Sequence, residues 1–475
     1  MALTRRDFAK CASAVFAAGA NCVFAAPESR PILRIGMLSD THMRTFDDGK
    51  GLQNCLGLES ILRFFDGRKV DGVVICGDLT DFGTARALKE LARVWFKVFP
   101  GNRRSDGEEI KPLFLMGDHD MGGYMHIDHR RWILPVCPDP TELDEIIPEM
   151  DVAKLWKECF HEDWSPIEVK TLKGVQFVMA HHPRHTKDSD KGNTIPGLEE
   201  FMSRQNFDPS KPFFYVQHRV LRGTLGFDAE RAWESGKQTR ILEKYPNAIA
   251  LCGHAHRNAT DEYNLWQGAF TAILVPSSNY NITRPGYENG YQRPEKKEIT
   301  SPLGNIRRSW QGLMGTLYSD RFVVERYDML NMSKIASDWV VPLPGPDGSQ
   351  NVLVRARKAA VPQFPAGVSV SVKVTKFKTR AKKNENVVMV SFPVAHAKNG
   401  APRAFDYKVD VRCDGKTVNT KLVFSRGQFW VDGKDTKLVE CPFRFKELPE
   451  NWRDSVRFAV TPRDSYGNEG RTVFS

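Results

Sequence analysis

The chain has 475 residues, of which 41% are hydrophobic and 27% are charged, values that exclude a fibrous or largely disordered protein. Its length is sufficient for two or three domains with buried cores. The formal net charge of +10 leaves room for an anionic partner, but the arginine and aromatic pattern of nucleic-acid-binding proteins is not evident, so no nucleic acid is expected.

Residues 1–25 are predicted to be an export signal rather than part of the fold. The stretch TRRDFAK (Thr4–Lys10) precedes a short, weakly apolar segment, the pattern of a bacterial twin-arginine signal peptide. The alternative is a membrane anchor, but the segment is short for a transmembrane helix and contains Asn21. We therefore expect cleavage after Ala25, a periplasmic or secreted protein, and no transmembrane anchor.

Residues 31–345 are predicted to form an α/β domain. Six apolar runs, rich in β-branched and aromatic residues, have the length of buried strands, and Thr84–Phe99 has the spacing of an amphipathic helix. Apolar strands that alternate with helices indicate sheets covered on both faces. The strand candidates are Ile32–Leu38, Val70–Cys76, Pro112–Met116, Val175–Ala180, Pro212–Val216 and Ala248–Cys252.

Residues 366–475 are predicted to form a second, all-β domain. Segments rich in proline and glycine, Pro342–Gln350 and Val361–Gly367, separate it from the α/β domain. Short strands of alternating polarity follow without a convincing helix, a pattern that favours a small β-sandwich. The last residues, VTPRDSYGNEGRTVFS, resemble the final strands of fibronectin type III or immunoglobulin-like modules.

Two features of this second domain are left open by the sequence. The basic stretch Lys373–Lys383 is either a solvated strand face, which we favour, or a site for an anionic surface or polymer. Cys413 and Cys441 could form a disulfide in an oxidising compartment, and their spacing alone does not decide this question.

Five of the strand candidates end directly in motifs that contain aspartate or histidine side chains able to ligate a metal ion. Because function gathers at the carboxyl ends of strands in α/β sheets, these side chains can converge. Carboxylates and imidazoles without thiolates suit Mn, Fe, Zn or similar divalent ions. The motifs are SDTH with Asp40 and His42, GDLTD with Asp78 and Asp81, GDHD with Asp118 and His119, QH with His218, and GHAH with His254 and His256.

In this order the motifs resemble those of the calcineurin-like metallophosphoesterase superfamily, over about Ile32 to Leu343. The resemblance implies a four-layer α/β/β/α sandwich with two divalent metal ions at its edge. It also implies hydrolysis of a small phosphodiester or phosphomonoester by a metal-bridged hydroxide. Carried over to this chain, it has Asp40, His42 and His256 bind one ion, Asp118, His218 and His254 bind the other, and Asp78 bridge the two.

The same resemblance assigns His119 and Asp81 to catalysis rather than to metal binding. His119 would stabilise the transferring phosphoryl group or protonate the leaving oxygen, and Asp81 would orient it. A carboxylate within hydrogen-bond reach raises the pKa of a histidine, which suits a proton donor near neutral pH.

Another group of histidines competes with His218 for its ligand position. The stretch MAHHPRH places His181, His182 and His185 after the remaining strand candidate. Motif order favours His218, because it follows a helical pattern and the strand Pro212–Val216, and GHAH comes next. The other three histidines are expected to line the pocket or stabilise the fold, although one could touch the substrate.

Asp118 departs from the usual motif of the family, which has an asparagine at this position. An aspartate can still ligate a metal ion, but it adds a full negative charge to the site. No tyrosine follows GDLTD closely, which disfavours the purple acid phosphatase branch. GDLTD and GDHD resemble phosphodiesterase branches more than protein phosphatases, so a phosphodiester substrate is slightly favoured.

Two other functions remain open at this stage. The chain could be a metal-binding or phosphate-binding protein with weakened catalysis, for which Asp118 is the motivating feature. It could also be a surface-binding protein that acts mainly through its second domain. Metal content and hydrolysis of an aryl phosphodiester distinguish the first alternative from an enzyme.

Overall fold

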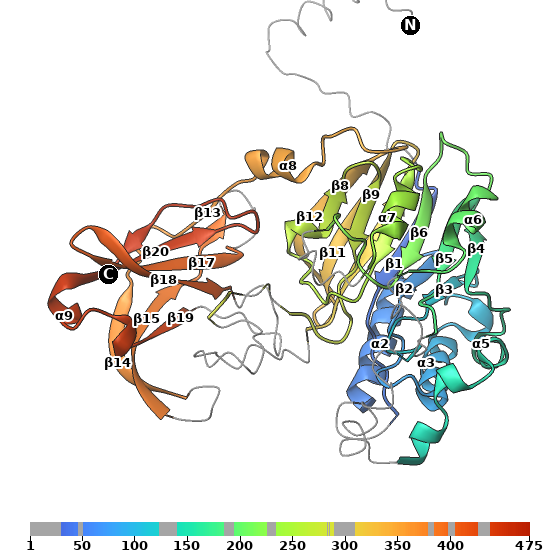
Figure 1. The fold of residues 1–475 in the computed structure, drawn as a ribbon, viewed down its shortest axis with the longest axis horizontal. Coiled ribbons are helices and arrows are strands. Elements are labelled where there is room, and N and C mark those ends of the chain that lie inside the picture. Colours follow the sequence, from blue (N-terminus) through green and yellow to red (C-terminus); the bar gives the residue numbers. More distant parts are fainter. Residues whose placement is uncertain are drawn as a thin grey trace, which may run out of the picture.

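The computed structural model describes most of the chain, which folds into an α/β part and a C-terminal β part (Figure 1). The predicted export signal lies outside the described residues. None of the described helices is long and apolar enough to span a membrane. The described residues are 30–45, 51–122, 140–184, 194–225, 234–282, 284, 286–288, 309–378, 384–397, 404–425 and 438–475.

The first sheet of the α/β part has six strands in the order β12-β11-β10-β1-β2-β3. Strands β1, β2 and β3 are parallel, and β10, β11 and β12 add to β1 in antiparallel fashion. The apolar runs predict β1 to β3 but not β10 to β12, whose glycines and alternating polar residues weaken the pattern. The strands are β1 (Leu33–Leu38), β2 (Gly72–Cys76), β3 (Lys111–Leu115), β10 (Gln311–Leu317), β11 (Arg321–Asp328) and β12 (Ser333–Pro342).

The second sheet also has six strands, in the order β4-β5-β6-β7-β9-β8. Strands β5, β6, β7 and β9 are parallel, and the edge strands β4 and β8 are antiparallel to their neighbours. The remaining three strand candidates correspond to β5, β6 and β7. The strands are β4 (Ile167–Leu172), β5 (Val175–Ala180), β6 (Phe213–Gln217), β7 (Ala248–Cys252), β8 (Leu265–Gln267) and β9 (Thr271–Leu274).

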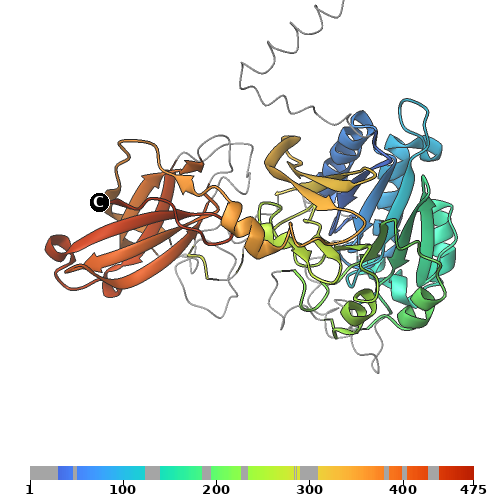
Figure 2. The ribbon, with the colours of Figure 1, turned by 90° about the horizontal axis from the view of Figure 1, so that it is seen from above.

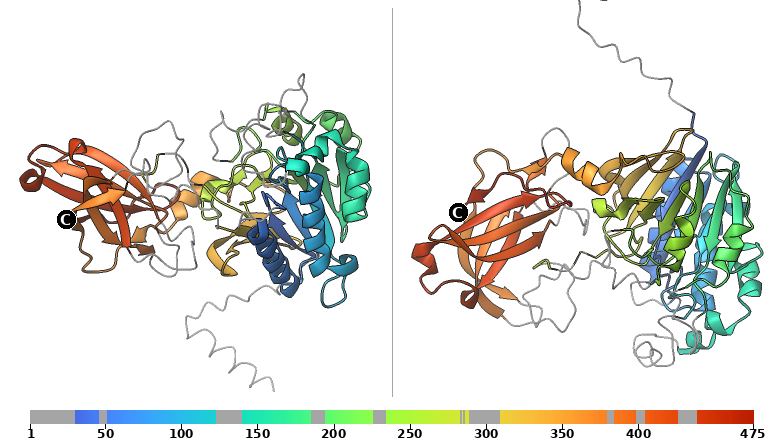
Figure 3. Two further views of the ribbon diagram at one scale, coloured as in Figure 1. Left: turned by 90° about the horizontal axis from the view of Figure 1, so that it is seen from below. Right: turned by 45° about the horizontal axis from the view of Figure 1, so that its top comes forward.

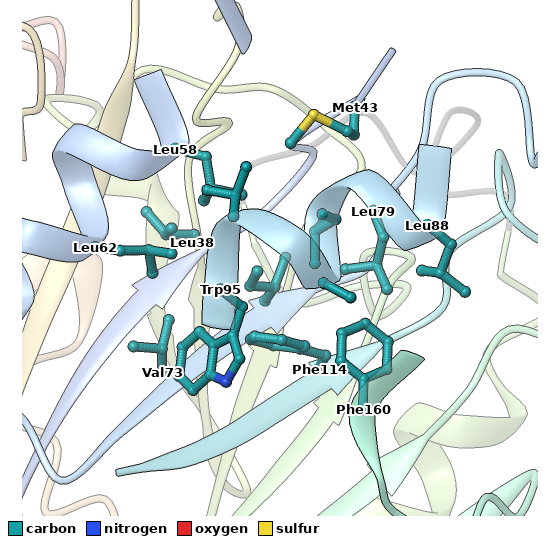
Figure 4. Close-up of a cluster of buried hydrophobic side chains, with 14 of the residues drawn as sticks. Leu38, Met43, Leu58, Leu62, Val73, Leu79, Leu88, Trp95, Phe114 and Phe160 are labelled. Carbon is teal, nitrogen blue, oxygen red and sulfur yellow. The ribbon is translucent and has the colours of Figure 1, made fainter. Parts of the chain in front are cut away.

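Three apolar clusters show how these elements are layered. One lies between the facing sheets and joins Met37 and Val74 to Phe214 and Leu251. Another joins the outer face of the first sheet to α2, α3 and α5, and Figure 4 shows this cluster around Trp95. A third joins the second sheet to α6 and α7. The helices are α2 (Gly51–Gly67), α3 (Ala85–Val98), α5 (Val152–Phe160), α6 (Leu198–Ser203) and α7 (Lys237–Leu242).

Helix α3 illustrates how the sequence pattern produces the layering. Its predicted amphipathic character is confirmed, because Leu88, Leu91 and Trp95 are buried against the sheet. The hydroxyl of Thr84 caps its first turn by accepting from the amide of Ala87. Burying each large apolar side chain contributes about 1.5–3 kcal/mol. The predicted four-layer α/β/β/α sandwich is confirmed by this arrangement.

The C-terminal part consists of antiparallel sheets, as predicted, and forms a separate body in Figures 2 and 3. Two of the sheets, β14-β15-β19 and β18-β17-β20-β21, share one apolar cluster that contains Phe392, Tyr407 and Val460. The likeness to fibronectin modules and the domain limits 31–345 and 366–475 stay predictions. The elements are α8 (Val352–Lys358), β13 (Pro362–Gln363), β14 (Ser371–Lys378), β15 (Asn384–Pro393), β16 (His396–Ala397), β17 (Asp406–Cys413), β18 (Lys416–Phe424), β19 (Leu438–Arg444), α9 (Trp452–Ser455), β20 (Val456–Arg463) and β21 (Val473–Phe474).

The cysteines of the C-terminal part do not form the disulfide that the sequence left open. Cys413 ends β17 and is partly exposed, whereas Cys441 is buried in β19, and both are free thiols. Burial raises the pKa of the Cys441 thiol. Cys441 therefore behaves as a small apolar core residue.

A buried polar cluster joins the two parts of the chain. The carboxylate of Glu262 accepts hydrogen bonds from Trp339 at 2.8 Å, Arg355 at 2.6 Å and Tyr466 at 3.2 Å. Its other oxygen lies 2.6 Å from the guanidinium of Arg326. Because Arg355 lies on α8 and Tyr466 follows β20, this cluster fixes the C-terminal part against the α/β part.

Candidate metal centre

The predicted ligands lie in the loops that directly follow β1, β2, β3, β6 and β7. These strands are buried along almost their whole length, so each loop begins at the edge of a covered sheet. Backbone contacts bring the loops of the two sheets together, since the amide of His254 donates to Asp40 Oδ2 at 3.0 Å. Of the seven ligand side chains, only that of His254 is not fully buried.

The backbone of these loops adopts a conformation that side chains rarely allow. Asp40, His42, Asp78, His254 and His256 all have a positive φ, between 44° and 68°. In this region the Cβ of an L-residue crowds the backbone, at a cost of about 1–3 kcal/mol per residue. The turn that results redirects the chain at the end of each strand and gathers the five side chains in one place.

Two glycines of the motifs are required by close approach. A Cβ at Gly117 would lie 2.2 Å from Asp78 Oδ1, and a Cβ at Gly253 would lie 1.8 Å from Ser39 Oγ. Both contacts are impossible for a larger residue without displacing a ligand loop. The glycines in GDHD and GHAH therefore permit the ligand loops to pack against one another.

One cluster of candidate ligands contains Asp40, His42 and His256. His256 Nε2 lies 3.0 Å from Asp40 Oδ1 and 3.2 Å from His42 Nε2. His42 Nε2 is 3.9 Å from Asp40 Oδ1. The three ligand atoms are thus close enough to hold one ion in common.

A second cluster contains Asp78, Asp118, His218 and His254. His218 Nε2 lies 2.9 Å from Asp118 Oδ1 and 3.1 Å from Asp78 Oδ1. His254 Nδ1 lies 3.2 Å from Asp118 Oδ1. The other oxygen of Asp78 is 3.9 Å from His42 Nε2, so this carboxylate stands between the two clusters.

Backbone carbonyls fix the orientation of two of these imidazoles. His218 Nδ1 lies 2.7 Å from the carbonyl of Cys76, and His256 Nδ1 lies 2.8 Å from the carbonyl of Tyr280. A ring that donates its Nδ1–H to a carbonyl presents the lone pair of Nε2 to the opposite side. This arrangement is typical of metal-ligating histidines.

The candidate ligand atoms include carboxylate oxygens that lack a hydrogen-bond donor, as expected for a site that binds a metal ion. Asp40 Oδ1 and Asp118 Oδ1 are buried, and neither accepts a hydrogen bond within the structure. A buried carboxylate oxygen without a donor is costly, so a positively charged partner is expected at each position. The donor set of carboxylates and imidazoles suits Mn, Fe or Zn, as the sequence predicts.

Comparison with known families agrees with this geometry. The family model described as Calcineurin-like phosphoesterase matches residues 33–258, which include both ligand clusters. This region is a calcineurin-like phosphoesterase domain. The same comparison gives no preference between phosphodiester and phosphomonoester substrates.

Solved structures match about two thirds of this chain at low identity. A dimetal phosphatase from Danio rerio is 11% identical with a TM-score of 0.37, and the match covers 66% of this chain and 99% of that one. GAP50, described as the anchor in the inner membrane complex of Plasmodium, is 12% identical with a TM-score of 0.37, and the match covers 69% of this chain and 93% of that one. A purple acid phosphatase from yellow lupin is 13% identical with a TM-score of 0.36, and the match covers 66% of this chain and 55% of that one. These similarities are too weak to inform the activity of this chain. No curated protein matches it.

In the phosphoesterase domain, His119 lies beside the two ligand clusters, and with His42 and Asp78 it forms a third group whose side-chain atoms are close enough to hold an ion. Its Nε2 is 3.8 Å from Asp78 Oδ2, and its Nδ1 is 2.7 Å from the backbone carbonyl of Asp81. The Asp81 carboxylate is 3.8 Å from this nitrogen, beyond hydrogen-bond distance, and instead lies 3.1 Å from His42 Nδ1 and pairs with Arg44. Asp81 therefore contacts His119 through its main chain, and it contacts the candidate ligand His42 through its side chain.

The charge environment of His119 favours its protonated form. Burial lowers the pKa of His119, but the carboxylates of Asp78, Asp118 and Asp81 outweigh this effect and raise it to about 9. Divalent ions near these carboxylates would offset part of their charge and bring the pKa down. The pKa of His119 therefore depends on the metal content of the site.

Asp120, the third titratable residue of GDHD, has a structural position that the sequence analysis did not assign. The amides of Leu79 and Thr80 donate to its carboxylate at 3.0 and 2.8 Å, and the amide of Gly117 donates at 2.8 Å. The Thr80 hydroxyl donates at 2.7 Å. Burial and the nearby Asp78 raise the pKa of Asp120 to about 6. This carboxylate fastens the second and third motif loops together.

The competing histidines lie outside both ligand clusters of the described residues. His181 Nδ1 accepts from the amide of Met116 at 3.1 Å, and its ring packs edge-on against Trp156 and Trp164. His182 is buried, and burial lowers its pKa to about 3. His185 falls outside the described residues. The geometry thus brings His218, rather than His181 or His182, to the ligand cluster.

Asp118 has a cationic neighbour that the sequence analysis did not identify. Arg219 follows the candidate ligand His218 and is buried, and its Nη2 lies 3.4 Å from Asp118 Oδ2. Burial opposes ionisation of Asp118, but the imidazoles of His254 and His218 hold its pKa well below its usual range. One oxygen of Asp118 faces the ligand cluster and the other faces the guanidinium. Arg219 therefore offsets the charge that an aspartate adds at this position.

Proposed function

We propose that this chain is a metal-dependent phosphoester hydrolase that uses two divalent ions. One observation carries the proposal: each ligand cluster contains a buried carboxylate oxygen, on Asp40 and on Asp118, that accepts no hydrogen bond. The family match over residues 33–258 supports the same class of reaction. A purely structural cluster of buried carboxylates would be expected to contain its own donors.

The two ligand sets divide the work of holding the ions. When bound, the ions supply Lewis acidity to the phosphoryl oxygens and lower the pKa of a water molecule. Asp78, with one oxygen near each cluster, would set the spacing between them. The proposed ligands of one ion are Asp40, His42 and His256, and those of the other are Asp118, His218 and His254, with Asp78 shared.

His119 is proposed to act on the reacting group without ligating an ion. Its Nδ1 is engaged by the Asp81 carbonyl, so Nε2 is the nitrogen turned toward the ligand clusters. A proton on that nitrogen can pass to the leaving oxygen or stabilise charge on the phosphoryl group. General acids of this kind contribute about 10²–10⁴-fold in rate.

The substrate and location are proposed from the sequence. GDLTD and GDHD favour a small phosphodiester slightly over a phosphomonoester. The twin-arginine pattern around Arg5 and Arg6 supports export to the periplasm or the medium, and changing both residues to lysine should leave precursor in the cytoplasm. The basic stretch Lys373–Lys383 keeps an anionic surface or polymer open as a further partner.

The test combines metal analysis with an aryl phosphate panel. The purified protein should contain about two divalent ions per chain and hydrolyse a bis-aryl phosphate, an aryl phosphate, or both. A chelator should abolish hydrolysis, and Mn or Zn should restore it. A protein that holds two ions but hydrolyses neither substrate class would support the binding-protein alternative instead.

A further inference from the structure

The segment after β9 runs from the metal centre to the C-terminal part. It is called here the connecting segment, and its described residues are 277–282, 284 and 286–288. It begins beside the loop that follows β1, where Ser39 and Ser277 form an isolated parallel bridge. Its end pairs with β18, through a bridge between Tyr287 and Leu422. The connecting segment therefore touches both bodies within twelve positions.

At the metal centre, the connecting segment supports the first ligand cluster. The hydroxyl of Ser277 donates to the carbonyl of Asp40 at 3.0 Å and accepts from the amide of Tyr280 at 3.1 Å. The carbonyl of Tyr280 lies 2.8 Å from His256 Nδ1, and its ring stacks on that imidazole with centroids 4.1 Å apart. The amide of Ile282 donates to the carbonyl of His256 at 2.7 Å. The connecting segment therefore restrains two of the three candidate ligands of this cluster, Asp40 and His256.

At its other end, the connecting segment is bound by the C-terminal part. The hydroxyl of Tyr287 donates to Asp406 Oδ2 at 2.7 Å, and its ring is buried with Phe405 and Phe424. The amide of Glu288 donates to the carbonyl of Leu422 at 2.7 Å. These contacts combine a buried aromatic ring, a charge-assisted hydrogen bond and strand-like pairing, each of which restrains the segment.

The second ligand cluster is held in a different way. The ring of His218 is oriented by the carbonyl of Cys76, at the end of strand β2. Asp78 accepts the amide of His119 at 2.9 Å, from the loop after β3. These supports of the second cluster come from the α/β core, whereas His256 and Asp40 depend partly on the connecting segment.

We propose that the C-terminal part positions the ligand set Asp40, His42 and His256 through the connecting segment. Tyr287 and Asp406 are positioning residues that act on this set by way of Tyr280 and Ser277. The inference rests on the proposed two-ion function, and it gives the C-terminal part a role in the reaction centre. Weakening the far end of the segment should loosen one ion site and spare the other.

The test uses the full-length protein with Tyr287→Phe and Tyr287→Ala. Asp406 keeps its two contacts with Arg463, at 2.6 and 3.0 Å, so Tyr287→Phe leaves no unpaired charge. Tyr407→Phe is the matched control, because it removes a buried hydroxyl that accepts from the Ala395 amide at 2.9 Å, within the C-terminal core. The parent and the three variants are loaded with Zn and titrated with a chelator.

In Tyr287→Phe, one of the two ions should be bound about tenfold more weakly, the lower end of the effect seen for residues that orient metal ligands. Tyr287→Ala should show a larger loss for the same ion, because the ring is removed as well. Tyr407→Phe should retain both ions as the parent does. Equal weakening of both ions, or parent-like retention in Tyr287→Ala, would overturn the inference while leaving the hydrolase proposal intact.

A second measurement works without metal. Hydrogen exchange of the Ile282 amide, which bonds to the His256 carbonyl, should become about tenfold faster in metal-free Tyr287→Ala than in Tyr407→Phe. Unchanged exchange contradicts the inference. If the parent itself binds fewer than two ions, the proposed function fails, and the exchange result alone then decides whether the C-terminal part positions this segment.

Discussion

The domain junction and the metal centre are both clusters of buried charges, but their charges are balanced in different ways. At the junction, the carboxylate of Glu262 is met by the guanidinium groups of Arg326 and Arg355. Trp339 and Tyr466 donate further hydrogen bonds to it. Both oxygens of this carboxylate therefore have partners within the chain, and the cluster is complete without a ligand.

At the metal centre, the carboxylates of Asp40, Asp78 and Asp118 gather around four imidazoles, and the guanidinium of Arg219 reaches Asp118 only at 3.4 Å. One oxygen of Asp40 and one of Asp118 accept no hydrogen bond. The described groups that face these two oxygens are imidazoles, which carry a positive charge only when protonated, so this cluster is suited to cations from outside the chain. The two clusters therefore differ in whether the chain itself supplies hydrogen-bond donors for every buried carboxylate oxygen.

The largest effect on metal content and activity is expected when a proposed metal ligand is removed. His218→Ala should lose the ion of the second cluster and most phosphoester hydrolysis, because Asp78 and Asp118 would face a cavity in place of an imidazole. His182→Ala, which removes a buried histidine outside the ligand clusters, is the matched control. Metal analysis and turnover are measured on both. Loss of metal in His182→Ala with two ions kept in His218→Ala would reverse the assignment.

The next largest effect should fall on rate without metal loss. His119→Ala should retain both ions, because its side chain is proposed to face the reacting group, and its turnover should fall about 10²–10⁴-fold. The loss should be smaller for substrates with good leaving groups, which need less protonation. His161→Ala, at an exposed histidine after α5, is the control. An equal loss across leaving groups of very different pKa would argue for charge stabilisation instead of proton donation.

A smaller effect is expected from the charge of Asp118. Asp118→Asn should keep the fold and bind metal about 10–100-fold more weakly, since it removes one negative charge and leaves the buried Arg219 facing the site. Arg219→Gln added to that variant should restore part of the lost affinity, because the pair is coupled. Chelator titration of the single and double variants measures this coupling. Additive losses would show that Arg219 does not offset Asp118.

The convergence of the ligand residues could be predicted because each follows a strand with a strong apolar signal. Buried strands such as Val70–Cys76 and Ala248–Cys252 are readable from sequence, and their ends place Asp78 and His254 at a sheet edge. Motif order also separated His218 from the competing histidines. These features depend on local sequence patterns, which can be recognised without knowledge of the tertiary structure.

The contacts around the ligands could not be predicted, because they depend on how loops from distant strands meet. GDHD contains two aspartates of identical chemistry, and only the fold shows that Asp118 faces the imidazoles while Asp120 binds loop amides. The carboxylate of Asp81 was expected at His119 but lies nearer to His42. Arg219 carries no motif at all. Single-sequence patterns do not encode such pairings.

The smallest effect on activity is expected at the junction. Glu262→Gln should leave metal content and turnover at neutral pH unchanged, because the connecting segment keeps its own contacts with Asp406 and Leu422. It should destabilise the fold by roughly 3 kcal/mol, because Arg326 and Arg355 lose their counter-charge. Glu325→Gln, at a more exposed ion pair with Arg68, is the control and should cost about 0–1 kcal/mol.

The pH dependence of this loss follows from the pKa of Glu262. Burial alone would raise it, but Arg326 and Arg355 outweigh burial and hold the pKa below its ordinary value of 4.5. A carboxylate with a depressed pKa stabilises the fold fully above that ordinary value, and the contribution disappears as the pH falls through the folded pKa. The difference in unfolding free energy between parent and Glu262→Gln should therefore be full at pH 7 and shrink progressively below about pH 4.5. Denaturant titrations at several pH values measure it, and a pH-independent difference would show that Glu262 acts through shape rather than through its charge.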